Sequence, residues 1–262
     1  MADYLARGAA PLSAEQWEQL DEVVVKTARS VLVGRRVVPL FGPLGAGVAA
    51  VPTVVAGPEG PRSALVELYE NAEDFAVDWR QLEQAKALGR MDWSAAAMAA
   101  ARCADREDRA IFLGCEECGL FGLLNVPGRQ ELKGGDWSDG EAIFADVVAA
   151  TAKLAEGGFP GPYALVASPQ TVALTKRWTP KGADLEDMIE ELATAGVFSS
   201  RHVPEKTLLV MQTGPQVADL AVGVDLTVAY TGNDGMTHLF RVLETGALRI
   251  KQPAGICVVA GK

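Results

Sequence analysis

Apolar residues recur at helical spacing near the start of the chain. The recurrence covers residues 13–32 and places five apolar side chains on one face: Trp17, Leu20, Val24, Ala28 and Val31. Ser13 and Gln16 form the S-x-x-Q pattern of a capping box, which predicts where the helix begins. Gly34 marks its end. The first predicted element is therefore an amphipathic helix.

The rest of the pattern predicts helices and strands without regular alternation. Helices are expected over residues 74–88, with Phe75, Trp79 and Leu82 on one apolar side, over 94–113, from Ser138 to a stop at Gly157, and over 185–195. Strands are expected over residues 35–41, 163–167, 207–212, 217–222, 226–230, 237–244 and 247–251. A doubly wound sheet requires alternating strands and helices, so the predicted fold class is α+β.

Composition and charge narrow the classes of partner. The chain has 262 residues and a formal net charge of −10. Binding to nucleic acid depends on Lys and Arg at the phosphates, so we expect no nucleic-acid partner. No apolar run approaches the roughly 20 residues of a transmembrane helix, and the sequence does not begin with a basic segment followed by an apolar one. We therefore expect a cytoplasmic protein without a membrane partner.

Residues that carry catalysis are scarce. The two histidines, His202 and His238, fit ordinary surface or hydrogen-bonded roles. Cys115 and Cys118 form a C-x-x-C motif with three interpretations: two half-buried thiols at a helix end, a redox pair, or half of a zinc site. The two other cysteines are isolated in the sequence. We expect no enzymatic activity, no cofactor and no metal.

Two short segments are predicted to be structural. Residues 42–47 are rich in glycine, but their spacing does not match a phosphate-binding loop, so a tight turn is expected. Residues 105–109 read Asp-Arg-Glu-Asp-Arg, and these charges are expected to pair with one another within the helix.

Several of these segments together resemble the family 1 encapsulins. The resemblance follows the chain in order through Ala-Pro-Leu-Ser at 10–13, Leu-Val-Gly-Arg-Arg at 32–36, Gly-Pro-Leu-Gly at 42–45, Trp-Arg-Gln-Leu-Glu at 79–83, Glu-Asp at 107–108, Ile-Phe at 111–112, the glycine- and leucine-rich run 119–124, Gly-Pro-Tyr-Ala-Leu-Val at 161–166, and the final segments 240–244, 248–251 and 256–257. No single motif is specific, but the ordered set covers nearly the whole chain.

The resemblance implies the HK97-like major capsid fold. It places the N-terminal helix and strand of a peripheral domain at 1–45, an extended arm (E-loop) at 46–73, the rest of the peripheral domain with its spine helix at 74–135, an axial domain at 136–222, and strands returning to the peripheral domain at 223–262. The implied function is a self-assembling shell of about 60 copies, or another symmetric number, around a cargo enzyme. Ferritin-like iron-storage and peroxidase cargoes are the expected classes. The alternative is a prophage capsid protein that packages DNA.

The resemblance also implies two sites. A short C-terminal peptide of the cargo would bind the first helix and a facing strand, at Val24, Val25, Ala28, Val31, Arg35, Val38 and Val228. A loop around a five-fold pore would contain Thr179, Pro180, Lys181 and Gly182.

The arm is predicted to depart from the family. Residues 46–73 are fewer than in relatives, and they contain Pro52, Pro58 and Pro61, each of which removes a donor from a strand ladder. We therefore expect that a full two-stranded hairpin does not form, although residues 65–69 offer a short strand. The hypothesis that follows is a smaller, less stable or differently symmetric particle.

Overall fold

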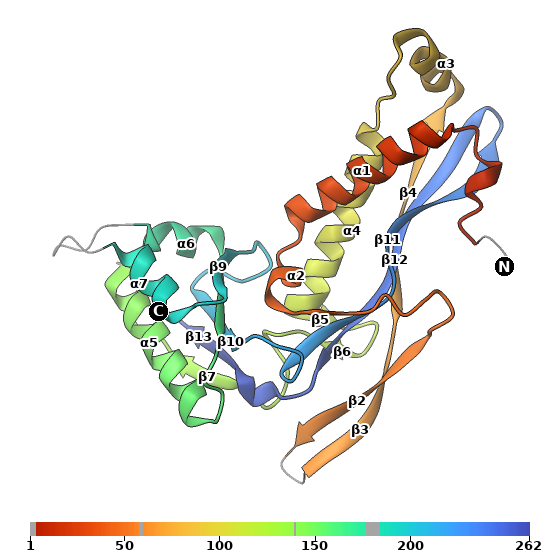
Figure 1. The fold of residues 1–262 in the computed structure, drawn as a ribbon. Coiled ribbons are helices and arrows are strands. Elements are labelled where there is room, and N and C mark those ends of the chain that lie inside the picture. The colour runs from red at the N-terminus through yellow and green to blue at the C-terminus, as the bar shows by residue number, and fades with distance from the viewer. Residues whose placement is uncertain (1–3, 58–59, 139, 177–183) are drawn as a thin grey trace.

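The computed structural model describes residues 4–57, 60–138, 140–176 and 184–262 (Figure 1). Its core is two separate sheets with helices packed against them, which confirms the α+β class. The first sheet has the order β1 (Leu40–Phe41), β11 (Ala218–Asp234), β12 (Thr237–Ile250) and β4 (Tyr69–Asp78). The second has the order β7 (Gln130–Lys133), β13 (Ile256–Ala260), β10 (Thr207–Gln212), β8 (Tyr163–Ala167) and β9 (Gly196–Ser199).

Two long helices pack on the first sheet. Helix α1 (Ala14–Val31) begins with the predicted capping box, in which Gln16 N–H donates to Ser13 Oγ and the Ser13 N–H donates to the Gln16 side chain. Helix α4 (Ser94–Leu113) has its predicted bounds. Their buried side chains form one core with the sheet, in which the side chains of Phe75 and Phe240 are stacked.

Four predicted strands in the final quarter are in fact two long ones. Strand β11 continues through residues 223–225 and β12 through residues 245–246, which separate the predicted strands, and three register shifts accommodate the irregular pairing. Gly223 and Gly246 lie where the strands approach closely: a Cβ on Gly223 would sit 2.6 Å from Thr245 Oγ1, and one on Gly246 would sit 3.0 Å from Ala221 O. The glycines here permit tight pairing rather than a chain reversal.

The predicted helix over residues 74–88 is wrong in its first third. Residues up to Asp78 belong to β4, where Phe75 and Val77 are buried and their neighbours are not, a period-two pattern. Asp78 then caps helix α3 (Trp79–Leu88) by accepting from Arg80 N–H at 2.8 Å. Trp79, which the sequence places on an apolar side with Phe75 and Leu82, is exposed.

The predicted strand over residues 35–41 is also mostly wrong. Residues Gly34–Val37 form the short helix α2, and only the two residues of β1 are extended. Asp108 of α4 explains the difference, because its carboxylate accepts from the backbone N–H groups of Val33 and Gly34. Of the tight turn predicted over residues 42–47, the structure has a turn at residues 46–47, closed by a hydrogen bond from Val48 N–H to Gly45 O. The residues before it run beside β11, so close that a Cβ on Gly42 would sit 2.2 Å from Val222 O.

The arm does form a two-stranded hairpin, against the prediction. Strands β2 (Ala50–Gly57) and β3 (Gly60–Glu67) pair over their whole length and extend away from both sheets (Figure 1).

The prolines avoid the ladder. The Pro52 carbonyl accepts from Arg249 of β12 at 2.9 Å, so the backbone of Pro52 faces away from β3. An antiparallel residue points its N–H and C=O to the same side, so the missing N–H belongs to the outer edge. Leu65 pairs with Pro52, so its backbone groups also face away from the partner strand. Backbone orientation repeats every two residues along a strand, and Pro61 lies four positions before Leu65, so Pro61 faces the outer edge as well. Pro58 lies outside the described residues. The hairpin removes the argument from the prolines, whereas the argument from the short arm is untested, and an altered particle stays a prediction.

The second sheet is covered by helices α5 (Gly140–Glu156), α6 (Pro169–Thr175) and α7 (Leu185–Leu192). The strands at 163–167 and 207–212 have their predicted bounds, Gly157 ends α5 as expected, and α7 is shorter than predicted. The chain also has two short 3₁₀ helices, η1 (Arg7–Ala9) and η2 (Pro253–Gly255), and a small hairpin after α4. The predicted segment 223–262 divides: β12 lies in the first sheet and β13 in the second.

Candidate functional site

A groove of about 490 Å³ runs beside α1. Its walls come from one stripe of α1, from α2, from β1 and from β11, and they comprise Val25, Ala28, Arg29, Leu32, Arg35, Arg36, Leu40, Asp225 and Leu226. The apolar wall is open to solvent, since Val25 is 37% exposed and Leu40 is 47% exposed. Such a mixture of exposed apolar side chains with a few charges is typical of a ligand or peptide site.

The structure divides the predicted cargo-binding residues. Val25, Ala28 and Arg35 line the groove. Val24 and Val228 are buried in the core between α1 and the sheet, because adjacent residues of a helix point about 100° apart. Val31 packs beside Ala28 and Leu32, and Val38 is buried in the core of the second sheet.

Sequence reasoning missed most of the groove wall. Arg29 and Leu32 follow Val25 by four and seven positions, so helical periodicity alone places them on the stripe of Val25. Leu40, Asp225 and Leu226 come from strands, and no local pattern connects them with α1.

Arg35 forms the floor of the groove. Its guanidinium donates to Glu107 of α4 at 2.6 Å, to Glu244 of β12 at 2.8 Å and to Asp225 of β11 at 2.7 Å. Asn71 supports this network by donating to the other oxygen of Glu244 at 2.6 Å. Burial raises the pKa of Glu244 well above its ordinary value, and Arg35 opposes that effect. Arg35 is therefore held by three carboxylates rather than left as a free cation at the rim.

The charges at 105–109 do not pair within the helix as predicted. Asp105 accepts from His202 at 2.6 Å and pairs with Arg201, whereas Asp108 accepts from the backbone of α2. Burial raises the pKa of Asp108 to about 6. Four of these five charges, on Asp105, Arg106, Glu107 and Asp108, instead link α4 to other parts of the chain.

The histidines have specific partners. His202 lies in the loop after β9 and is mostly buried against α4. His238 Nδ1 lies 3.1 Å from the Tyr230 hydroxyl, so both histidines have the ordinary hydrogen-bonded role that was expected.

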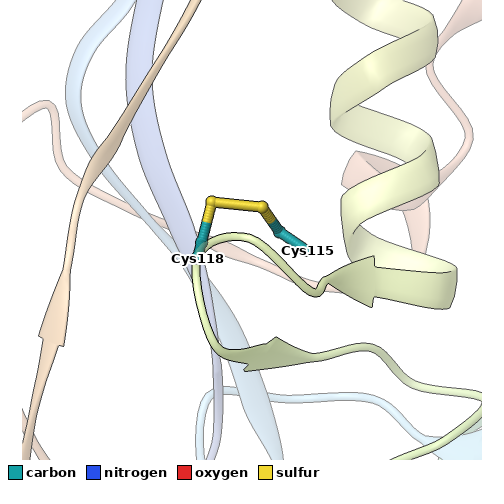
Figure 2. The surroundings of a disulfide bond; sticks show 2 residues. All are labelled: Cys115 and Cys118. Atoms are coloured by element: carbon teal, nitrogen blue, oxygen red, sulfur yellow. A yellow bond between two sulfur atoms is a disulfide. The ribbon is translucent and has the colours of Figure 1, made fainter.

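The C-x-x-C motif is a disulfide in the structure, which overturns the interpretation as two free thiols. Cys115 ends β5 (Gly114–Cys115), and Cys118 lies in the turn before β6 (Leu120–Phe121) (Figure 2). Cys103 and Cys257 are buried free thiols. Among residues 4–57, 60–138, 140–176 and 184–262, no group of three or more His, Cys, Asp or Glu side chains could hold a metal ion.

Two remaining predictions concern a pore and a membrane. The predicted pore residues Thr179, Pro180, Lys181 and Gly182 lie outside the described residues. Within the described part of the chain, every helix is too short or too polar to cross a bilayer.

Comparison with known proteins identifies the family. A family model described as "Encapsulating protein for peroxidase" matches residues 2–247. The type 1 encapsulin shell protein EncA of Myxococcus xanthus is 39% identical over 280 residues, covering 100% of this chain and 98% of the relative. A diheme-cytochrome-encapsulin shell fusion protein of Kuenenia stuttgartiensis is 35% identical, covering 95% of this chain and 73% of the fusion.

Solved structures give the fold. A virus-like particle protein from Pyrococcus furiosus superposes with a TM-score of 0.78 at 20% identity, covering 94% of this chain and 100% of that one. The capsid protein of the myovirus XM1 superposes with a TM-score of 0.62 at 11% identity, covering 91% of each. The predicted HK97-like capsid fold is confirmed. The relatives identified by sequence are encapsulin shell proteins, and the chain belongs to the family of type 1 encapsulin shell proteins.

Proposed function

We propose that copies of this chain assemble into a closed shell around a cargo enzyme, and that a short terminal peptide of the cargo binds the groove beside α1. The observation that carries the peptide site is the groove itself. It combines exposed Val25 and Leu40 with a rigid ionic floor at Arg35.

The dimensions of the groove suit a short peptide. A cavity of about 490 Å³ accommodates a few apolar side chains, and their burial contributes roughly 25 cal/mol per Å². The rim carries Arg29 and Arg36, which can donate to the peptide backbone or its carboxylates. Weak single contacts suffice, because many cargo copies and many grooves share one particle.

The family supplies the class of cargo. The description of the matching family model names a peroxidase, and the Kuenenia relative is fused to a diheme cytochrome. A relative from Pyrococcus furiosus is described as a ferritin-like-encapsulin shell fusion protein. A redox enzyme or a ferritin-like protein is therefore the favoured cargo, and the copy number of about 60 stays a prediction. No observation favours the prophage alternative, since the solved phage capsid shares only the fold.

The test uses a fluorescent reporter that carries the C-terminal segment of a redox enzyme encoded beside this chain. Val25→Asp should lower reporter loading into purified shells by roughly tenfold, because a carboxylate would be buried against apolar side chains. Val148→Asp on α5 is the matched control, since Val148 is 40% exposed, close to the 37% of Val25, and lies outside the groove. Equal loading of intact Val25→Asp and wild-type shells would refute the site.

A further inference from the structure

Cys118 and Cys115 occupy a small hairpin that the shell function does not use. The hairpin joins the end of α4 to the loop at residues 122–126. Cys118 is exposed at its turn, and Cys115 is half-buried in β5 (Figure 2). The disulfide between them spans three positions of sequence, so it constrains the turn and little else.

The base of the hairpin is held without the disulfide. Leu123 and Leu124 donate backbone hydrogen bonds to Ile111 and Phe112, both at 2.9 Å. Asn125 closes the loop from its side chain, with Nδ2 donating to Leu113 O at 2.7 Å. The disulfide can therefore open while the surrounding fold persists, and both sulfur atoms then stay close enough to re-form the bond.

The other two cysteines are buried and unreactive by comparison. Cys103 is fully buried, and burial raises the pKa of its thiol to about 12. Cys257 is also fully buried, with a pKa raised to about 11. Thiol chemistry requires an accessible thiolate or an accessible disulfide. The accessible cysteines are therefore the two of the C-x-x-C hairpin.

We propose that Cys115 and Cys118 form a reversible two-electron redox site whose substrate is a dithiol. A thiolate of the external dithiol attacks the exposed Sγ of Cys118, the protein S–S bond breaks, and the electron pair leaves on Cys115 Sγ, which takes up a proton. The second thiol of the reductant then attacks its own mixed-disulfide sulfur and releases Cys118 as a thiol. The protein gains two electrons and two protons, and the dithiol becomes a cyclic disulfide.

The turn between the two cysteines is acidic. Glu116 and Glu117 stand between the cysteines, and their negative charge disfavours a protein thiolate at this turn. Closure of the reduced hairpin by an external disulfide therefore proceeds through a small population of protein thiolate. This role is independent of the peptide groove and adds a redox function to the shell.

The test counts thiols on assembled shells with a maleimide of known mass. Oxidised shells should take up no label. After incubation with dithiothreitol, each chain should carry two labels, at Cys115 and Cys118, with Cys103 and Cys257 unlabelled as internal controls. Removal of the dithiothreitol and addition of oxidised glutathione should return the count to zero.

A second measurement distinguishes opening of the disulfide from loss of the fold. The Cys118→Ser shell should label at Cys115 without any reductant, with particle size unchanged. Labelling of wild-type Cys115 or Cys118 before reduction would overturn the proposal. So would intact shells that resist dithiothreitol, reduced shells that do not close again, or labelling of Cys103 at the same rate as Cys118.

Discussion

Arg35 Nη2 lies 2.8 Å from Glu244 Oε2, and this contact joins α2 to the central strand β12 beneath the groove. Both side chains are largely buried, with Glu107 as a second carboxylate partner at 2.6 Å. The guanidinium therefore compensates two carboxylates that have little access to water. The floor of the groove and the packing of α4 against the first sheet depend on the same group.

Replacement of Arg35 should cost much more stability than replacement of its neighbour. Arg35→Met leaves Glu107 and Glu244 buried without a cation, which costs about 3–5 kcal/mol. Denaturant unfolding followed by tryptophan fluorescence measures the loss. Arg36→Met is the matched control, because Arg36 is exposed on the same short helix and should change stability little. Similar losses for both variants would contradict the role given to Arg35.

Asp108 should make stability depend on pH between about 4 and 6. Its folded pKa of about 6 exceeds the ordinary 3.8 of the unfolded chain, so the folded state binds more protons in this window. Stability should then fall as the pH rises through the window, by up to about 3 kcal/mol. The buried Glu244 shifts in the same direction.

Asp108→Asn removes the titration and should flatten this part of the curve. Its amide oxygen can still accept from α2. Unfolding midpoints measured at several pH values give the slope, with the exposed Asp234→Asn as a control that should retain it. An Asp108→Asn protein with the wild-type slope would show that Asp108 is not its source.

The outer face of the arm should matter for assembly and not for folding. Val54 and Leu65 are exposed on the same face of the β2–β3 hairpin, Leu65 to 73%. Exposed apolar patches of this kind mark contact surfaces. Leu65→Asp should reduce the particle fraction in size-exclusion chromatography by roughly tenfold. Ala64→Asp, on the opposite face of the same strand, should reduce it less; the reverse order would place the contact on the other face.

Arg249 should control how firmly the arm is attached. Its guanidinium donates to both oxygens of Asp219 at 2.7 Å and also to Pro52 O at 2.9 Å. Arg249→Lys keeps the charge but loses the fork that serves both partners. Hydrogen exchange over residues 50–57 should accelerate by roughly tenfold, while exchange in α4 stays unchanged. Unchanged exchange in β2 would show that the hairpin is held by other contacts.

Local signals predicted the long helices well. The capping box at Ser13 and the apolar periodicity of residues 94–113 each act within one helix, so the local sequence is enough to predict these helices. Helix α2 was missed because its cap, Asp108, lies 74 residues from Gly34. The arm was misjudged because the effect of a strand proline depends on which edge it faces, and register decides that.

The candidate groove was only partly predictable for the same reason. The sequence identifies α1 as amphipathic, but the choice between the adjacent Val24 and Val25 requires knowing which face meets the sheet. Arg35 was correctly singled out, yet its three carboxylate partners come from α4, β11 and β12 and are distant in sequence. Family resemblance supplied the fold, and the packing supplied the site.

The position of β13 determines when the second sheet can be completed. This strand lies inside the second sheet, between β7 and β10, yet it follows every other strand of that sheet in the sequence. Until β13 leaves the ribosome, β7 has no neighbour in the sheet and β10 exposes an apolar edge. The second sheet therefore stays incomplete until β13 has been synthesised. A chain synthesised only through β12 therefore lacks the strand that joins β7 to the rest of the second sheet.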